Sequence, residues 1–82
     1  VISVVAVSLK NFGPPETVPE RFAGRRFYHH NTTVTLMRTT PEENDRIGKE
    51  VAEKASAAKG PTAVLLPLRG VSAIDVEGGP FW

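Results

Sequence analysis

The chain has 82 residues, of which 40% are hydrophobic and 23% are charged, and this composition is typical of a soluble globular chain rather than a disordered one. Ten basic residues against nine acidic ones give a formal net charge of +1, which argues against a protein built mainly to hold nucleic acid or an anionic membrane surface. The lack of cysteine excludes disulfides, thiolate nucleophiles and cysteine-based zinc sites, and it is compatible with the cytoplasmic location that we expect.

The first predicted strand covers residues 1–9, VISVVAVSL, which are Val, Ile, Ala and Leu interrupted only by serine. Such a run is typical of a strand in a parallel sheet that is covered on both faces. Pro14, Pro15 and Pro19 lie in the segment that follows, residues 10–24. Because proline fixes φ and removes a backbone donor, we expect an ordered loop there.

A second strand, predicted over residues 33–38, leads directly into a helix predicted over residues 41–58. Thr40 and Glu43 stand three residues apart, as in a capping box, and Pro41 occupies the first helical position, where its missing N–H costs nothing. The spacing of apolar residues predicts a thin, alanine-rich inner stripe on this helix, made of Ile47, Val51, Ala55 and Ala58.

A third strand is predicted over residues 62–68, TAVLLPL, which is again apolar on both faces, and a loop is predicted over residues 69–82. Strand, helix and strand in this order form the βαβ unit of a parallel sheet, so the predicted fold class is α/β. The chain begins with Val and ends on GGPFW, so we expect a single fragment of a larger α/β domain.

Two loops are predicted to leave the sheet at the carboxyl ends of its strands, where open α/β folds hold their ligands. One contains Arg38, Thr39 and Thr40 at the helix N-terminus, where free amides and a cation can hold an anion. The other follows the third strand and holds four residues of interest: Arg69, Gly70, Ser72 and Asp75. Together they predict a phosphate or carboxylate site.

A simpler interpretation needs no ligand. Thr40 then serves only as the helix cap, Arg38 pairs with Glu42 or Glu43, and Arg69 is solvated. The two interpretations stay open at this point.

No metal site is predicted. His29 and His30 are the only histidines, and in an extended segment they point to opposite faces and cannot bind one metal together. Asp75 and Glu77 could form an acidic pair, but solvated charge is the default without a companion ligand. Residues 21–30, RFAGRRFYHH, interleave basic and aromatic side chains, a pattern that can bind single-stranded nucleic acid, although the balanced total charge disfavours it.

Three consecutive stretches resemble one family: NFGPPETVPERFAGRRFYHHN, VTLMRTTPEEN and LLPLRGVSAIDVEGGPFW. The family is the Tm-one-like ATP-binding domain family, which is named for the tomato mosaic virus resistance protein and occurs in bacteria as an uncharacterised protein family. The resemblance covers nearly the whole chain, in order and with natural spacing.

The resemblance implies two Rossmann-like α/β halves in a protein several times longer, with this chain in the second, C-terminal one. It also implies ATP as a cofactor, although the family's nucleotide signature lies near the amino terminus of the full protein and nothing here matches it. At most, six residues of this chain would line the cleft facing the rest of the protein: Arg38, Thr39, Thr40, Arg69, Gly70 and Ser72.

Two functions follow as expectations. In the first, the chain supplies one wall of a nucleotide or small-anion cleft, with Arg38 and Arg69 neutralising an anion and Asp75 as a weak candidate for acid/base catalysis. In the second, it is a non-catalytic protein-interaction or regulatory module. The expected partners are the remainder of the full-length protein and a second copy of the chain, and neither a membrane nor nucleic acid is expected.

Overall fold

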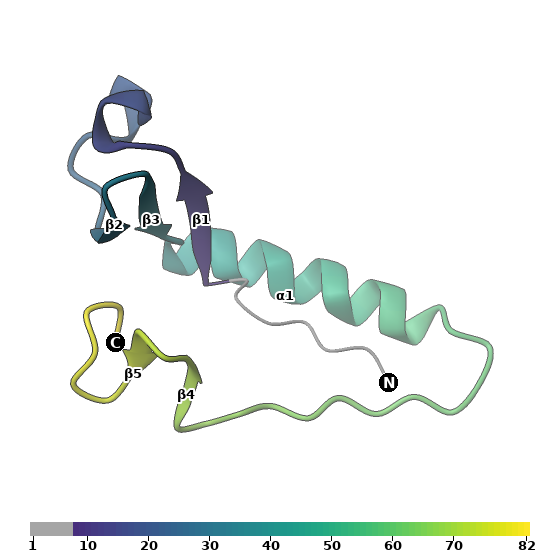
Figure 1. Ribbon diagram of the computed structural model, residues 1–82. Helices are drawn as coiled ribbons and strands as arrows, with labels where there is room; N and C mark the ends of the chain where they lie inside the picture. The colour runs from purple at the N-terminus through teal and green to yellow at the C-terminus, as the bar shows by residue number, and fades with distance from the viewer. Residues whose placement is uncertain (1–7) are drawn as a thin grey trace.

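The computed structural model describes residues 8–82, so the strand predicted over residues 1–9 lies almost wholly outside the described residues. Figure 1 shows a small sheet, one long helix that projects from it, and an extended segment that leads back to a short hairpin. In chain order the elements are β1 (Leu9–Phe12), the 3-10 turns η1 (Pro15–Thr17) and η2 (Glu20–Phe22), β2 (Phe27–Asn31), β3 (Val34–Arg38), α1 (Pro41–Ser56), β4 (Gly70–Ser72) and β5 (Asp75–Val76).

The main sheet has three strands in the order β1-β3-β2, and both pairings are antiparallel. Asn31, Thr32 and Thr33 form the tight turn between β2 and β3, and the Asn31 side-chain oxygen accepts hydrogen bonds from the Thr33 amide and hydroxyl, both at 2.9 Å. A turn this short can join only antiparallel neighbours, because parallel strands need a crossover of a dozen or more residues. The predicted Rossmann-like parallel sheet with a βαβ unit is therefore wrong: residues 8–82 form one α-helix and two antiparallel sheets.

The central strand β3 carries most of the small core. Thr35 and Met37 point to one face of the sheet, and they are 1% and 3% exposed. Leu36 points to the other face, where Tyr28 lies opposite it on β2. On that second face the Tyr28 ring meets the edge of the Phe81 ring, with centroids 6.4 Å apart and planes at 75°. Phe81 is 1% exposed, so the end of the chain covers one side of the sheet.

The second sheet is the β4–β5 hairpin, which lies within the residues predicted as a loop, 69–82. Gly70 has φ of +137°, and a Cβ at this position would collide with the Val76 side chain and lie 2.9 Å from the carbonyl oxygen of Asp75. The chain ends on Trp82, which is 57% exposed and whose carbonyl oxygen accepts a 3.3 Å hydrogen bond from Arg26 Nη1. The hairpin thus brings the last residues back to the main sheet.

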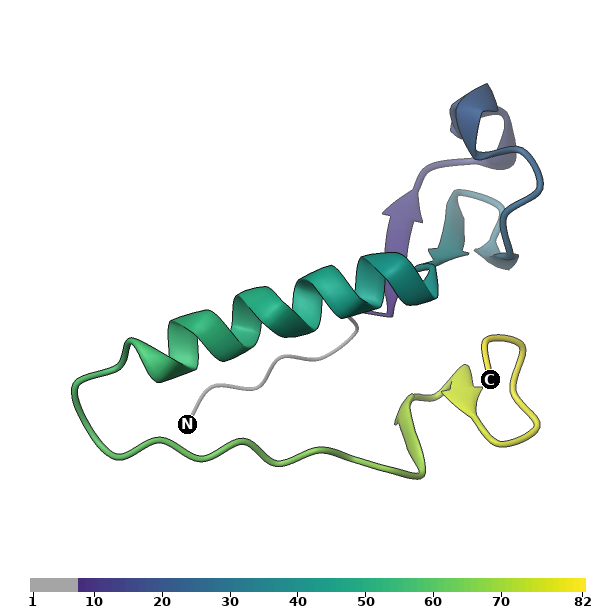
Figure 2. The ribbon, with the colours of Figure 1, turned by 180° about the vertical axis from the view of Figure 1, so that it is seen from behind.

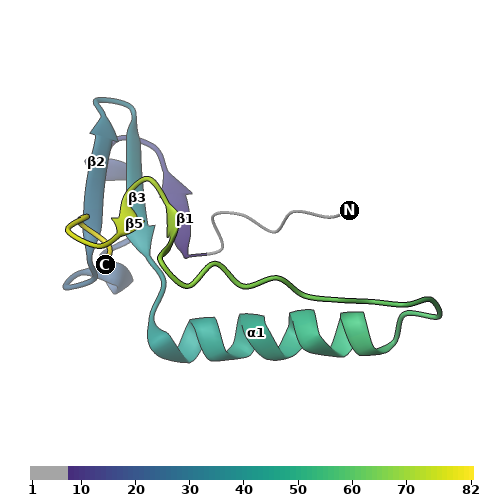
Figure 3. The ribbon, with the colours of Figure 1, turned by 90° about the horizontal axis from the view of Figure 1, so that it is seen from below.

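Helix α1 covers Pro41–Ser56, two residues shorter than the predicted 41–58. The predicted capping box is confirmed: the Thr40 hydroxyl accepts from the Glu43 amide at 3.1 Å, and the Glu43 carboxylate accepts from the Thr40 amide at 2.9 Å. Along the predicted stripe, Ile47, Val51 and Ala55 are partly covered, but no residue of the helix is fully buried. Figure 3 shows why, since only the first turns of α1 lie near the sheet.

Residues 61–69 leave the helix and run back along it in the opposite direction as an extended segment (Figures 1 and 2). The structure has no strand at residues 62–68, where the sequence predicted one. Apolar side chains in this segment are largely exposed: Val64 58%, Leu65 94%, Leu66 73% and Leu68 85%. The pattern of a buried strand is present, but within residues 8–82 no neighbouring strand pairs with it.

Candidate functional site

The most connected polar group of the described chain is the guanidinium of Arg38, at the end of β3. Its Nε donates to the carbonyl oxygen of Phe81 at 3.0 Å, and Nη1 donates to the carbonyl oxygen of Ser8 at 3.0 Å and to the Thr39 hydroxyl at 3.3 Å. Its Nη2 forms an ion pair with Asp75 Oδ2 at 2.9 Å. One side chain thus ties the start of β1, the hairpin and the end of the chain together.

Asp75 is the buried partner in this cluster. Its side chain is 4% exposed, against 23% for that of Arg38. The Asp75 amide also donates to the Ser72 hydroxyl at 3.1 Å, which holds the hairpin in shape. An uncompensated charge in such a place would be costly, so Arg38 is needed where it is. We call the contacts of Arg38 with Asp75, Phe81 and Ser8 the arginine latch.

The structure brings Arg38 and Asp75 together, but it leaves Arg69 exposed and outside this cluster. The predicted ion pair of Arg38 with Glu42 or Glu43 is wrong, because the partner of Arg38 is Asp75. Since four of its five N–H groups are already engaged, Arg38 has little capacity left to bind an anion.

The residues at the helix N-terminus are engaged as well. The Thr39 hydroxyl donates to the Asn44 side-chain oxygen at 2.6 Å, and Thr40 caps the helix. The cation at this end is Arg25, whose Nη2 donates to the carbonyl oxygen of Arg38 at 2.9 Å and pairs with Glu43 at 2.6 Å. The pKa of Glu43 is held below its usual value, first by the backbone amide of Thr40 and then by Arg25. Sequence reasoning missed Arg25, because 18 residues separate the two partners.

The second predicted loop contributes less. Gly70 allows the two strands of the hairpin to approach closely, because a Cβ there would collide with Val76. The Ser72 hydroxyl accepts a hydrogen bond from the Asp75 amide. Of the six residues predicted to bind a ligand, five have a structural role, and Arg69 alone among them is an exposed cation.

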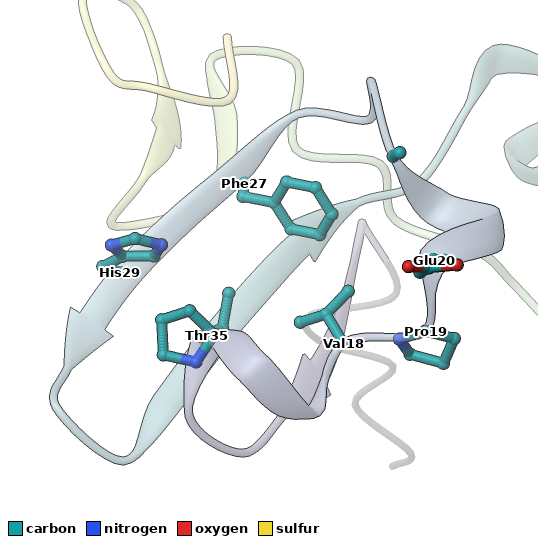
Figure 4. Close-up of a pocket in the computed structure, with 8 residues that line it drawn as sticks. Val18, Pro19, Glu20, Phe27, His29 and Thr35 are labelled. Carbon is teal, nitrogen blue, oxygen red and sulfur yellow. The ribbon is translucent and has the colours of Figure 1, made fainter.

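Two hollows lie on the face of the sheet that carries Thr35 and Met37. The larger, with a volume of about 650 Å³, lies between the sheet and α1, and we call it the helix groove; it is lined by Leu9, Lys10, Phe12, Arg21, Phe22, Met37, Thr39, Glu43, Arg46, Ile47 and Glu50. The smaller has a volume of about 170 Å³ and lies under the two 3-10 turns (Figure 4), and we call it the turn cavity. Only Thr39 among the predicted site residues lines either one.

The basic and aromatic pattern of residues 21–30 was the one sequence signal for these hollows. Phe22 packs against Phe12 with ring centroids 5.7 Å apart, and the guanidinium groups of Arg21 and Arg25 lie 4.8 and 5.6 Å from the centre of its ring. The phenylalanines therefore build the wall of the helix groove, and Arg21 stands at its rim.

Neither a metal centre nor a membrane segment is found in the described part of the chain. No group of three or more His, Asp or Glu side chains gathers there in a way that could hold a metal ion. No helix within residues 8–82 combines the length and apolar character needed to cross a bilayer.

Comparison with known proteins gives the family. A family model described as the C-terminal domain of the uncharacterised protein family UPF0261 matches residues 1–82, and the chain belongs to this family. It is 57% identical over 82 residues to a UPF0261 protein of Clostridium tetani, and 55% identical over 80 residues to one of Rhizobium meliloti. It is also 44% identical over 82 residues to the ToMV resistance protein Tm-1 of Solanum lycopersicum.

These matches cover 98–100% of this chain, but only 20% of the two bacterial relatives and 11% of the tomato protein. The chain thus spans about a fifth or less of the length of these relatives. The predicted resemblance is confirmed at the level of the UPF0261 C-terminal domain family with its tomato homologue.

Proposed function

We propose that the chain is a non-catalytic contact module of the UPF0261 C-terminal domain, which joins the remainder of the intact protein through the extended segment Val64–Leu68. The observation that carries this proposal is the exposure of four large apolar side chains in a row of five residues, at 58–94%. Contiguous exposed apolar surface of this kind is typical of an interaction site.

The backbone of the segment supports the same proposal. Residues 62–68 take part in no backbone hydrogen bond with any other residue of the range 8–82. Successive side chains of an extended segment alternate between two faces, so Leu65 lies on one side and Leu66 and Leu68 on the other. An extended segment that is apolar on both sides, with backbone groups that are unpaired within residues 8–82, is suited to a partner that supplies both apolar cover and hydrogen bonds.

The remainder of the intact protein is the partner that we propose. The two bacterial relatives place about four fifths of their length outside the stretch that matches this chain. A covalently linked partner is always present, and its high effective concentration favours contact over any free molecule.

A catalytic role for Asp75 has less support. Its carboxylate is 4% exposed and is engaged by Arg38 at 2.9 Å, so it is not open to a substrate. A general acid or base must come within hydrogen-bond reach of the reacting group. The contact module therefore takes precedence over the enzyme hypothesis.

Amide hydrogen exchange tests the proposal. In the intact protein, the amides of Val64–Leu66 and Leu68 are expected to exchange slowly, because they are covered and hydrogen-bonded. Leu66→Asp should expose the segment to proteolysis in the intact protein, whereas Thr62→Asp, a change at a nearby exposed polar residue, should not. Fast exchange at all four amides in the intact protein would overturn the proposal, and protection that depends on protein concentration would replace it with contact between two copies.

A second candidate function is the expected cleft for ATP or another small anion, and the helix groove favours it. Its volume of about 650 Å³ lies in the range of ligand sites. Lys10, Arg21 and Arg46 stand at its rim and have no ion pair with another residue of the described chain. These cations, rather than Arg38, would then meet the phosphates.

Calorimetric titration of the intact protein with ATP tests this candidate. Arg21→Ala and Arg46→Ala should each weaken ATP binding, and Lys59→Ala, which removes an exposed cation outside the groove, is the matched control. Unchanged affinity in the double variant Arg21→Ala/Arg46→Ala would remove the helix groove as the ATP site.

The proposal includes a cytoplasmic location, which a sequence without cysteine accommodates. Fractionation of cells that produce the intact protein checks this. Recovery in a secreted or membrane fraction would contradict it.

A further inference from the structure

The turn cavity is a small, preformed hollow that the proposed contacts do not use. It lies between the sheet and the two 3-10 turns, and Figure 4 shows Phe27 and His29 on β2, Val18 and Pro19 between the turns, and Glu20 at the start of η2. Its volume is about 170 Å³. An enclosed apolar cavity of about 150 Å³ is large enough to hold benzene, and this hollow, which is open to solvent, has room for a molecule of a single ring.

The walls are apolar and stiff. Five of the eight lining residues are apolar: Pro15, Val18, Pro19, Ala23 and Phe27. Each turn begins next to a proline, Pro15 being the first residue of η1 and Pro19 the one before η2, and proline fixes the backbone there. Within the turns the amides of Val18 and Ala23 donate to the carbonyl oxygens of Pro15 and Glu20 at 3.2 and 2.9 Å. The hollow is therefore held open by its own backbone.

One buried polar group in the lining lacks a partner. Thr35 is 1% exposed, and its hydroxyl makes no hydrogen bond to any group of the described chain. A buried hydroxyl without a partner is destabilising, and valine would fill the same space without that cost. A small molecule bound in the cavity would explain why this position holds a hydroxyl, because the molecule would supply the missing hydrogen-bond partner.

The charge at the edge of the cavity narrows the class of guest. Glu20 lies in the lining and disfavours an anion, and the apolar walls disfavour any charged group. We propose that the turn cavity binds a small neutral molecule in which one apolar ring or branched chain carries a single hydroxyl or carbonyl group. The ring packs against Phe27, Val18 and Pro19, and the polar group bonds to the Thr35 hydroxyl.

The experiment uses phenol and toluene as probes on the intact protein, followed by methyl NMR. Phenol should shift the methyl signals of Val18, Ala23 and Thr35 in a saturable manner and leave Ala52, an exposed residue of α1, unchanged. Ala23→Leu, which fills the cavity from an exposed position, should abolish the binding of both probes.

Thr35→Val tests the role of the hydroxyl separately from the role of the cavity shape. It keeps the shape of the side chain, and it should weaken phenol by about two- to tenfold while toluene binds as before. Because it removes a buried hydroxyl without a partner, it should not lower Tm, so a loss of phenol binding cannot be ascribed to unfolding. Three results would overturn the proposal. Thr35→Val could bind phenol as tightly as the unchanged protein, or phenol binding could survive Ala23→Leu. The third is the absence of any shift at Val18 because another part of the intact protein fills the cavity.

Discussion

Strand β3 and the segment Val64–Leu68 are both five residues long and carry three or four large apolar side chains, but they lie in opposite environments. In β3, Thr35, Leu36 and Met37 are 1%, 9% and 3% exposed. In the segment, Leu65 and Leu66 are 94% and 73% exposed. The segment is the more apolar of the two, since β3 contains a threonine and an arginine, so apolar content alone does not explain the outcome.

The difference lies in the neighbours that each run has within residues 8–82. β3 pairs with β1 on one side and with β2 on the other, and the end of the chain covers one of its faces. Val64–Leu68 follows a helix that leads about 24 Å away from the sheet, given 16 residues at a rise of 1.5 Å each. The comparison teaches that an apolar run becomes a buried strand only where backbone partners and cover are within reach of it.

The largest expected change in stability comes from a test that makes one substitution in each of these two regions. Leu36→Ala should lower the free energy of unfolding by about 2–5 kcal/mol, because it leaves a hole in the small core. Leu66→Ala in the same 82-residue chain should change it by less than about 0.5 kcal/mol, since its side chain is exposed. Urea unfolding of the two variants measures both values, and equal losses would show that the segment is buried in solution.

Breaking the arginine latch comes second. Arg38→Met should cost about 2–3 kcal/mol, because it leaves the buried Asp75 carboxylate and two carbonyl oxygens without their donor, although partial exposure of Arg38 reduces the effect. Arg69→Met is the control and should be neutral. Adding Asp75→Leu to Arg38→Met should restore part of the stability, and an additive loss in this double-mutant cycle would contradict a direct pair.

Removal of the helix cap is expected to lower the free energy of unfolding by a smaller amount, and its structural effect should be confined to α1, outside the core. Thr40→Ala should cost about 1 kcal/mol, because the Glu43 amide loses its acceptor. Helical content by circular dichroism should fall, while the methyl signal of Leu36 stays unchanged. A cost close to zero would mean that water replaces the cap fully.

The smallest effect is the pH dependence of the same cap. The pKa of Glu43 in the folded chain is lowered from 4.5, so its stabilising contribution is present above that value and is lost as the pH falls through the lower folded pKa. Helical content followed between neutral and acidic pH should show this loss, and Glu43→Gln should remove that part of the profile. Glu53→Gln, a change on the exposed side of α1, is the control and should keep it.

The sequence correctly predicted those structural features that depend only on residues close together in the chain. The capping box was predicted because Thr40 and Glu43 are three residues apart, and the start of α1 followed from Pro41. The predicted end of the helix lies two residues too late, because α1 ends at Ser56, with Ala57 as the C-cap, although alanine favours a helix.

The structural features that the sequence did not predict depend on residues that are far apart in the chain. Arg38 and Phe81 are 43 residues apart, and no periodicity connects them. The pairing of β2 with β3 was not predicted, although Asn31 and the two threonines after it form a recognisable turn. The parallel sheet was inferred from two apolar runs, of which one lies almost wholly outside the described residues and the other has no partner among them.

The position of Trp82 has a consequence for spectroscopy. It is the only tryptophan of the chain, it follows the buried Phe81, and its carbonyl oxygen is held by Arg26. Indole fluorescence therefore monitors the attachment of the last residues to the sheet, while far-ultraviolet dichroism is dominated by α1. Denaturation curves that coincide for the two signals would mean that the latch and the helix melt as one cooperative unit, and separate curves would mean that one dissolves while the other persists.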